Sequence, residues 1–285
     1  MSISARKRYI LQMKSGKLEL GERTLVMGVL NVTPDSFSDA GKFHHFHAAV
    51  RQALDMIVSG ADLLDIGGES TRPSSEPVPV EMELERVIPV IEAVRESSDI
   101  PISIDTTKAE VARQALAAGA DIINDISSLR FDPLMAETAA EFNAPLILMH
   151  MQGTPRTMQD NPSYHSILSE IIAFLEERIQ YAMDQGVDRG QIIVDPGIGF
   201  GKTVHHNLVL VKNLHAFQCL DRPILLGASR KRFIGAVLDR PVDDREVGTA
   251  VVNSMGIASG AHIVRVHDVE FHRQAAVMAD AVRTA

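Results

Sequence analysis

Residues 100–125, IPISIDTTKAEVARQALAAGADIIND, contain one complete unit of the fold. The apolar run at residues 102–104 predicts a buried strand, and residues 108–118 carry apolar side chains at helical spacing. Gly119 and Ala120 then end the helix, and residues 122–123 begin a second strand at once. A strand, a helix and a second strand joined in this way form a βαβ unit, in which the two strands run parallel.

The same unit recurs along the chain. Eight short apolar runs are predicted as strands, at residues 25–30, 62–66, 102–104, 122–123, 146–149, 192–194, 224–226 and 262–266. Helical spacing separates several of them, at residues 48–59, 80–97, 108–118, 167–185 and 245–260. The seven intervals from Asn31 to Arg265 average about 33 residues, the length of a βα unit. Eight such strands favour an α/β fold closed into a (β/α)8 TIM barrel, with an open doubly wound sheet as the alternative.

The chain is interpreted as one domain over residues 1–285. A (β/α)8 barrel of this length commonly forms a single domain, and no low-complexity linker interrupts the sequence. Residues 9–13 and 17–20, on either side of Gly16, predict a β-hairpin within residues 1–24 that covers the bottom of the barrel. Aromatic residues make up only 5% of the chain and Trp is absent. The core is therefore aliphatic, which suits strands buried on both faces.

The charge balance excludes several partners. With 28 basic and 37 acidic residues, the net charge is −9. Such a chain has no general attraction for nucleic acid or an anionic membrane, so any bound anion needs a local basic site. We find no apolar run long enough to span a bilayer and no secretion signal. The single cysteine, Cys219, indicates a reducing compartment, and we expect a cytoplasmic protein.

Polar side chains follow every predicted strand. In barrels of this class the active site lies where the strands end. The residues at these ends are Asn31, residues 67–72, Asp105, Asn124, Asp125, His150, Asp195, residues 229–231, Arg265 and His267. A barrel with a purely structural role does not need so many polar groups at one rim, so the pattern indicates an enzyme.

Two of these strand ends allow a different interpretation. Asp105 could cap the helix that follows, but Thr107 and Glu110 have the spacing of a capping box, which leaves Asp105 available for the site. Asn124 and Asp125 are adjacent, so one faces the barrel interior and the other faces the helices. The alternation of the short strand does not say which.

Several well-known motifs are excluded. The loop at residues 195–203, DPGIGFGKT, has Pro196 where a Walker A phosphate loop requires glycine, and Asp195 before Pro-Gly could be a simple turn residue. The stretch around Ser229 lacks the second glycine of a nucleophile elbow. No cysteine or carboxylate stands at a metal-ligand spacing from the histidines at positions 44, 45, 47, 205 and 206.

Basic residues concentrate late in the chain. Arg230, Lys231 and Arg232 follow the seventh predicted strand, and Arg265 and His267 follow the eighth. Barrels commonly bind phosphate at this position, so the cluster favours an anionic substrate. The alternative is that residues 230–232 only begin a solvated helix.

Six motifs resemble the dihydropteroate synthase family. They are MGVLNVTPDSFS at residues 27–38, GGESTRP at 67–73, LMHMQGTP at 148–155, DPGIGFGK at 195–202, SRKRF at 229–233 and RVHD at 265–268. They occur in family order and cover nearly the whole chain. The resemblance implies a single-domain barrel that joins 6-hydroxymethyl-7,8-dihydropterin pyrophosphate to p-aminobenzoate. The products would be 7,8-dihydropteroate and pyrophosphate, in folate biosynthesis, with Mg²⁺ required.

The resemblance also implies roles for individual residues. The pterin would be bound by Asp105, Asn124, Ile126, Met149, Asp195, Gly199, Phe200 and Lys231. The p-aminobenzoate would be bound by Thr71, Arg72, Pro73, Phe200, Lys231 and Arg232. Pyrophosphate would be held by Asn31, Thr71, Arg265 and His267, with Mg²⁺ bridging it to the Asn31 oxygen. The catalytic residues would be Asp105, Lys231, Arg265 and His267. Pyrophosphate would leave first, and Asp105 would stabilise the resulting cation.

Two residues depart from the family pattern. Ser74 follows Pro73 where glycine is common, and Arg232 follows Lys231 where serine is common. The backbone N–H of Arg232 would then replace a side-chain hydroxyl toward the aminobenzoate carboxylate. Residues 32–43 and the loop after the second predicted strand are rich in Pro, Ser, Asp and Gly, and we expect both to order over the second substrate.

Two other functions fit part of the pattern. A pterin-barrel methyltransferase would not need the anion site of Arg265 and His267, and a non-catalytic pterin-binding module would lack rim residues that this sequence retains. The resemblance further favours a homodimer formed through the last helices. Residues 245–260 carry small and apolar positions on more than one helical face, which is also compatible with simple packing on the barrel.

Overall fold

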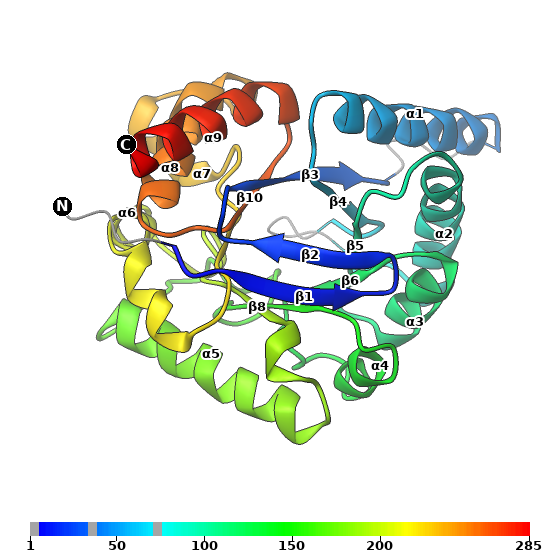
Figure 1. Cartoon of the computed structure of the whole chain (residues 1–285), viewed down its shortest axis with the longest axis horizontal. Helices are drawn as coiled ribbons and strands as arrows, with labels where there is room; N and C mark the ends of the chain where they lie inside the picture. Colours follow the sequence, from blue (N-terminus) through cyan, green and yellow to red (C-terminus); the bar gives the residue numbers. More distant parts are fainter. Residues whose placement is uncertain (1–5, 34–38, 71–75) are drawn as a thin grey trace.

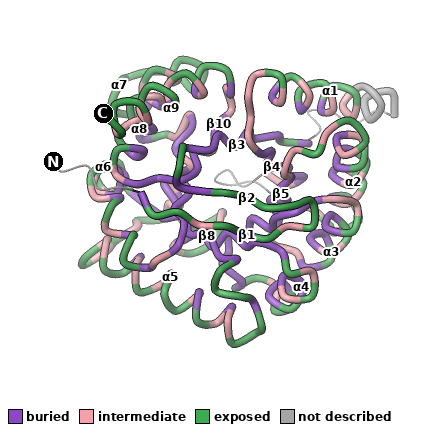
Figure 2. Tube along the Cα trace, in the orientation of Figure 1, coloured by how far each residue is buried: buried purple, intermediate pink, exposed green. Residues whose placement is uncertain are grey.

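The architecture is known from a computed structural model, which describes residues 6–33, 39–70 and 76–285, with the backbone alone for residues 39–44. Figure 1 shows a sheet of parallel strands in the middle, helices around it, and the hairpin of β1 (Tyr9–Met13) and β2 (Gly16–Leu20) crossing one end. The antiparallel hairpin pairs Leu11 with Leu18, as the residues around Gly16 predict. In Figure 2 the strands of the barrel are mostly buried, whereas the helices are exposed on their outer faces.

Eight parallel strands form the barrel predicted from the sequence. They are β3 (Leu25–Asn31), β4 (Leu63–Gly67), β5 (Ile102–Asp105), β6 (Ile122–Asp125), β7 (Leu146–Met149), β8 (Ile192–Asp195), β9 (Leu225–Leu226) and β10 (Ile263–Val266). Their spatial order is β8-β7-β6-β5-β4-β3-β10-β9. A parallel bridge between Val194 and Ile224 joins the two ends of this order. The ring therefore closes, which excludes the open doubly wound sheet.

Nine helices and three short 3₁₀ segments connect the strands in the described part of the chain. The helices are α1 (Asp39–Val58), α2 (Val80–Ser97), α3 (Ala109–Ala118), α4 (Met135–Glu141), α5 (Ile167–Asp184), α6 (Val204–Lys212), α7 (Arg232–Leu238), α8 (Glu246–Ala258) and α9 (Val269–Thr284). The five predicted helical segments are confirmed as α1, α2, α3, α5 and α8. None of the described helices is both long and apolar enough to cross a membrane.

Alternation along the short strands divides the barrel interior into two layers. On β10, Ile263 belongs to the apolar cluster at the bottom of the barrel, Val264 packs outward under the helices, and Arg265 follows on the interior side. The bottom cluster comprises Leu25, Met27, Leu63, Ile122, Ile147, Ile193, Leu225 and Ile263 from the strands, with Leu11, Leu18 and Leu20 from the hairpin. The hairpin thus closes the amino-terminal end with apolar side chains, and polar residues start one layer above.

The capping box expected at Thr107 and Glu110 is not formed, so that prediction was wrong. Helix α3 begins at Ala109, whose N–H donates to the Asp132 carboxylate at 2.8 Å. Thr106 accepts the Lys108 N–H at 3.2 Å instead. A carboxylate from the next loop therefore caps the helix, a contact between segments distant in sequence that a local spacing rule cannot anticipate.

Candidate active site

The upper layer of the barrel interior brings polar side chains from five strands together. The inward residues are Asp65 on β4, Asp105 on β5, Asn124 on β6, Asp195 on β8 and Arg265 on β10. The three aspartates and the asparagine are buried. Asp65, Asn124, Asp195 and Arg265 each follow a side chain of the bottom cluster by two residues, and Asp105 continues the alternation of β5. Alternation along a strand therefore places all five on the interior side. The carboxyl ends of adjacent parallel strands meet at one rim, so these groups converge.

Arg265 links two buried carboxylates. Its Nε donates to Asp65 at 2.5 Å and its Nη2 donates to Asp105 at 2.7 Å. Asn124 also donates to Asp65, at 3.0 Å. Asp65 therefore fixes both Arg265 and Asn124, while its Oδ1 has no partner within the described residues. Sequence analysis did not single out Asp65, although an acid inside an otherwise apolar strand was an available signal.

The same contacts settle which neighbour of the β6 pair faces the interior. Asn124 points inward to Asp65, whereas Asp125 accepts the N–H groups of Ser127 at 2.8 Å and Leu129 at 2.6 Å. Asp125 thus shapes the loop after β6 and does not enter the barrel. Its pKa is raised by burial, which these hydrogen bonds oppose.

Burial shifts the protonation of both rim carboxylates. Burial and the neighbouring Asp65 raise the pKa of Asp105 to about 7, and the positive charge of Arg265 opposes this shift. Burial raises the pKa of Asp195 to about 6, although its Oδ1 accepts the Gly197 N–H at 2.7 Å. Two carboxyl groups that titrate close to neutrality in one cavity are typical of a functional site.

An apolar slot lies beside these polar groups. Ile126, Met149, Met151, Met158 and Phe200 form a small buried cluster separate from the main core. Lys231 places its Nζ 4.0 Å from the centre of the Phe200 ring, and its pKa is lowered to about 8 by burial and by Arg265.

The glycines of the loop after β8 allow this close packing. Gly199 has φ +84°, and a Cβ there would lie 3.0 Å from Cδ of Lys231. At Gly197, with φ +69°, a Cβ would lie 1.9 Å from the His150 carbonyl oxygen. A side chain at either position would displace the loop or the lysine, so glycine is required to bring backbone this close to the slot.

Lys202 joins that loop to the end of β7. It is buried, and its Nζ lies 2.9 Å from Nδ1 of His150 and donates to the Phe200 carbonyl oxygen at 2.8 Å. Burial lowers the pKa of Lys202 well below its usual value, and burial together with Lys202 lowers that of His150 to about 2. Lys202 ends the DPGIGFGK motif, but nothing in its local sequence indicates a buried lysine paired with a histidine.

The late basic residues separate into different environments. Arg230 forms an ion pair with Glu246 on α8, and Arg232 is exposed at the start of α7. His267 is half-buried beside Ser229, and Asn31 is exposed at the end of β3. Of the five late basic residues, Lys231, Arg265 and His267 therefore remain near the rim, a smaller set than the sequence indicates.

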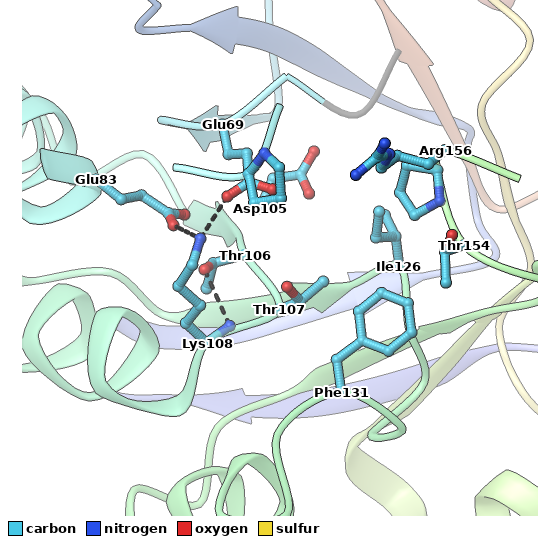
Figure 3. A pocket seen from close by; sticks show the side chains of 12 residues that line it. Glu69, Glu83, Asp105, Thr106, Thr107, Lys108, Ile126, Phe131, Thr154 and Arg156 are labelled. Carbon is cyan, nitrogen blue, oxygen red and sulfur yellow. Dashed lines mark hydrogen bonds and ion pairs between the residues drawn. The ribbon is translucent and has the colours of Figure 1, made fainter. Parts of the chain in front are cut away.

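A cavity of about 380 Å³ opens beside Asp105. Figure 3 shows Glu69, Glu83 and Lys108 on one side, and Arg156 and Thr154 across from them. Lys108 forms ion pairs with both glutamates, and Glu83 is fully buried. Thr71, Arg72, Pro73 and Ser74 lie outside the described residues, as do residues 34–38 of the predicted loop at residues 32–43.

Comparison with known proteins assigns this arrangement to a class. Residues 27–267 match the family described as pterin binding enzyme, so the barrel and its rim define a protein of that class. A curated relative from Synechocystis sp., named dihydropteroate synthase, is 51% identical over 263 residues, covering 92% of this chain and 91% of the relative. The chain belongs to the dihydropteroate synthases, transferases of folate biosynthesis.

Solved structures agree with this membership. The dihydropteroate synthase of Xanthomonas albilineans with 4-aminobenzoic acid has a TM-score of 0.90 and 42% identity, covering 98% of this chain and 100% of that one. A structure of the same organism's enzyme in complex with 7,8-dihydropteroate has a TM-score of 0.83 and 42% identity, covering 92% of this chain and 95% of that one.

Proposed function

We propose that this chain, as one domain, joins 6-hydroxymethyl-7,8-dihydropterin pyrophosphate to p-aminobenzoate, releasing pyrophosphate and 7,8-dihydropteroate. The observation that carries the proposal is the upper layer of the barrel, where Asp105, Asn124 and Asp195 converge beside an apolar slot. The relatives crystallised with 4-aminobenzoic acid and with 7,8-dihydropteroate support it, since these are a substrate and the product of the reaction.

The pterin ring fits the boundary between polar and apolar groups. Its edge carries N–H donors, which two carboxylates and the Asn124 amide can accept, and its faces are flat and apolar. Ile126, Met149, Gly199 and Phe200 would line the faces, with Lys231 above Phe200. Buried polar groups left unpaired by a wrong ligand would discriminate strongly against it.

The p-aminobenzoate would bind at the outer edge of this slot. Phe200 and Lys231 offer an apolar face and a cation, and the backbone N–H of Arg232 would meet the carboxylate. Thr71, Arg72 and Pro73 would complete the pocket from the loop after β4.

Pyrophosphate would be held by Asn31, Thr71, Arg265 and His267. Arg265 uses Nε and Nη2 for its two carboxylates, and its Nη1 has no partner within the described residues. A guanidinium carries five N–H groups, so Nη1 remains available to an anion while the other groups hold the side chain in place.

We propose that Mg²⁺ accompanies the pyrophosphate. The described residues contain no group of three His, Cys, Asp or Glu side chains that could hold a metal ion. Mg²⁺ bound through phosphate oxygens and water needs few protein ligands. The side-chain oxygen of Asn31, which is exposed, would be sufficient as the protein ligand. When bound, Mg²⁺ would supply positive charge to the leaving group.

The chain's own residues would act by position and charge. Departure of pyrophosphate leaves a positive methylene on the dihydropterin, whose electron-rich ring delocalises the charge. Ionised Asp105 would stabilise this cation without forming a bond to it, and the bound amine then attacks the carbon and releases one proton to solvent. Preorganised charge and positioning can each supply several kcal/mol in a closed site.

Product formation tests the proposal directly. The purified protein is given the dihydropterin pyrophosphate, p-aminobenzoate and Mg²⁺, while pyrophosphate release and dihydropteroate are followed separately. We expect both products, in equal amounts, only when all three components are present. Pterin binding without product would instead identify a non-catalytic binding module.

We also propose that the protein is a homodimer and that it is located in the cytoplasm. Val247, Val251 and Met255 on α8 are spaced four residues apart and are 71%, 55% and 50% exposed, which makes one apolar stripe on the helix surface. A second copy of this helix face would cover it. Light scattering should give twice the chain mass for the native protein and the single chain mass for Val251→Arg.

A further inference from the structure

Ser229 and His267 form a close pair at the rim. Ser229 follows β9 and His267 follows β10, and these strands are neighbours in the barrel. The Ser229 Oγ lies 2.9 Å from Nδ1 of His267 and also 3.2 Å from the backbone N of His267. One hydroxyl therefore contacts the same histidine twice, and Ser229 is buried.

The placement of protons follows from these two contacts. A backbone N–H can only donate, so the Ser229 oxygen accepts the hydrogen bond from the His267 backbone. The hydroxyl carries one proton of its own, and among the described residues its only remaining partner is Nδ1. If Nδ1 carried a proton, the buried hydroxyl proton would have no acceptor, which is unfavourable. Nδ1 is therefore the acceptor, and in the neutral ring the proton lies on Nε2.

We propose that Ser229 is a positioning residue that holds His267 in the Nε2–H tautomer, so that the ring presents an uncharged N–H donor to the leaving pyrophosphate. The inference rests on the proposed function, in which His267 binds that group. Nε2 has no hydrogen-bond partner within the described part of the chain, and it is therefore available to a ligand.

The surroundings of His267 favour the neutral ring. Burial, followed by the charges of Arg265, Arg230 and Lys231, lowers the pKa of His267 to about 4, against the opposing charge of Glu246. At neutral pH the imidazole is therefore uncharged, and its effect on an anion depends on the tautomer. With the proton on Nδ1, Nε2 would direct a lone pair at the phosphate oxygens and repel them.

The tautomer can be measured without any ligand. In protein labelled with ¹⁵N-histidine, the His267 ring signals are assigned by their loss in His267→Ala. We expect Nε2 in the protonated range and Nδ1 in the unprotonated range. In Ser229→Ala both tautomers should become populated, whereas Ser103→Ala, which removes another buried hydroxyl, from β5, should leave the pattern unchanged. A proton on Nδ1 in the native protein, or an unchanged pattern in Ser229→Ala, overturns the inference.

Affinity for inorganic pyrophosphate with Mg²⁺ tests the consequence. Calorimetry should show a loss of about threefold to tenfold in Ser229→Ala, the size of one hydrogen bond. In His267→Gln the amide offers an N–H donor with no tautomer to set, so adding Ser229→Ala to that variant should cost less than it costs the native protein. An equal loss in both backgrounds would mean that Ser229 acts by another route and would overturn the inference.

The two ideas fail in different ways. If His267→Ala leaves pyrophosphate affinity unchanged, the proposed role of His267 is wrong, and the inference falls with it whatever the tautomer. If His267→Ala loses affinity but the native ring carries its proton on Nδ1, only the inference about Ser229 is wrong.

Discussion

The lower and upper layers of the barrel interior lie two residues apart on the same strands, yet their chemistry is opposite. On β10 the step is from Ile263 to Arg265, and on β4 from Leu63 to Asp65. The lower layer is built on a cluster of apolar side chains that the hairpin closes, while the upper layer holds carboxylates, an amide and a guanidinium. One backbone geometry thus supports both a core that stabilises the fold and a cavity that binds a polar ligand.

The upper layer is stabilised by ion pairs and hydrogen bonds between its side chains rather than by burial of apolar surface. Removing a carboxylate or a guanidinium from water is unfavourable unless each charge is paired, and Arg265 pairs with two acids at once. The lower layer gains directly from every apolar side chain that it excludes from water. Substitutions in the two layers should therefore differ in what they damage, and the following predictions test that difference.

Arg265→Ala should have the largest effect, because it leaves Asp65 and Asp105 buried without their cation. Breaking a buried ion pair costs about 3–5 kcal/mol of unfolding free energy. We also expect turnover to fall more than tenfold with the fold intact, and Asp105→Ala to lower turnover to a similar extent. Chemical denaturation and initial rates measure the two quantities.

Arg273→Ala is the matched control for this prediction. Arg273 forms an ion pair with Asp62 at 2.9 Å that is partly open to solvent, and such pairs are worth about 0–1 kcal/mol. Turnover should stay at the native level. Full activity in Arg265→Ala would show that the upper layer does not take part in the reaction.

Leu11→Ala should damage stability alone. Leu11 is fully buried where the hairpin closes the lower layer, and truncation of a buried leucine costs about 2–5 kcal/mol. The rim lies at the other end of the barrel, so kcat and KM should remain within about twofold of the native values at a temperature where the variant is folded.

Ile10→Ala on the same strand serves as the control, because Ile10 is 56% exposed. Its unfolding free energy should change by less than about 0.5 kcal/mol. A large change in kcat for Leu11→Ala would mean that the two layers are coupled.

The sequence anticipated the lower layer better than the upper one. The apolar runs and the helix-ending glycines located all eight strands, because these signals are local. The sequence could not show which residue of β6 faces the interior. The contact of Asn124 with β4 and that of Asp125 with the following loop decide it, and neither contact is visible in the local sequence. An acid inside an apolar strand marks Asp65 as unusual, but its role could not be predicted because its partner, Arg265, lies 200 residues away.

Family motifs supplied residues that local patterns alone could not connect. Lys202 and His150 were both visible at strand ends or in motifs, yet their contact at 2.9 Å depends on how the loop after β8 packs on β7. Arg230 belonged to an apparent basic cluster, but Glu246, which follows it by 16 positions, pairs with it. Charges near one another in sequence need not face the same ligand.

Acidic pH should impair the function of the upper layer without any change to the lower layer. Burial raises the pKa of Asp195 to about 6, so its carboxylate, which would accept the pterin N–H groups, is lost below that pH. We expect kcat/KM for the dihydropterin substrate to fall first as Asp105, whose pKa is about 7, takes up a proton, and to fall more steeply below pH 6, where Asp195 takes up a proton as well. The steady-state rate measured from pH 4.5 to 8 tests both steps, and Asp195→Asn should retain only the step near pH 7.

The contribution of Asp195 to stability should change in the opposite direction over the same range. The folded protein retains a proton on Asp195 up to about pH 6, whereas an unfolded aspartate loses it near 3.8. At this residue the folded state therefore binds more protons between these values, so the contribution of Asp195 to the unfolding free energy decreases as the pH rises through that window. A pH-independent difference in stability between the native protein and Asp195→Asn would contradict the raised pKa.

Arg232→Ser should have the smallest effect. Arg232 lies at the outer edge of the upper layer, is exposed, and has no hydrogen-bond or ion-pair partner among the described residues. Its unfolding free energy should change by less than about 0.5 kcal/mol. If the backbone N–H of residue 232 binds the aminobenzoate carboxylate, the KM for p-aminobenzoate stays within about threefold, because any residue except proline supplies that donor. A tenfold rise in KM would show instead that the guanidinium binds the carboxylate, and the polar layer would then extend to the surface of α7.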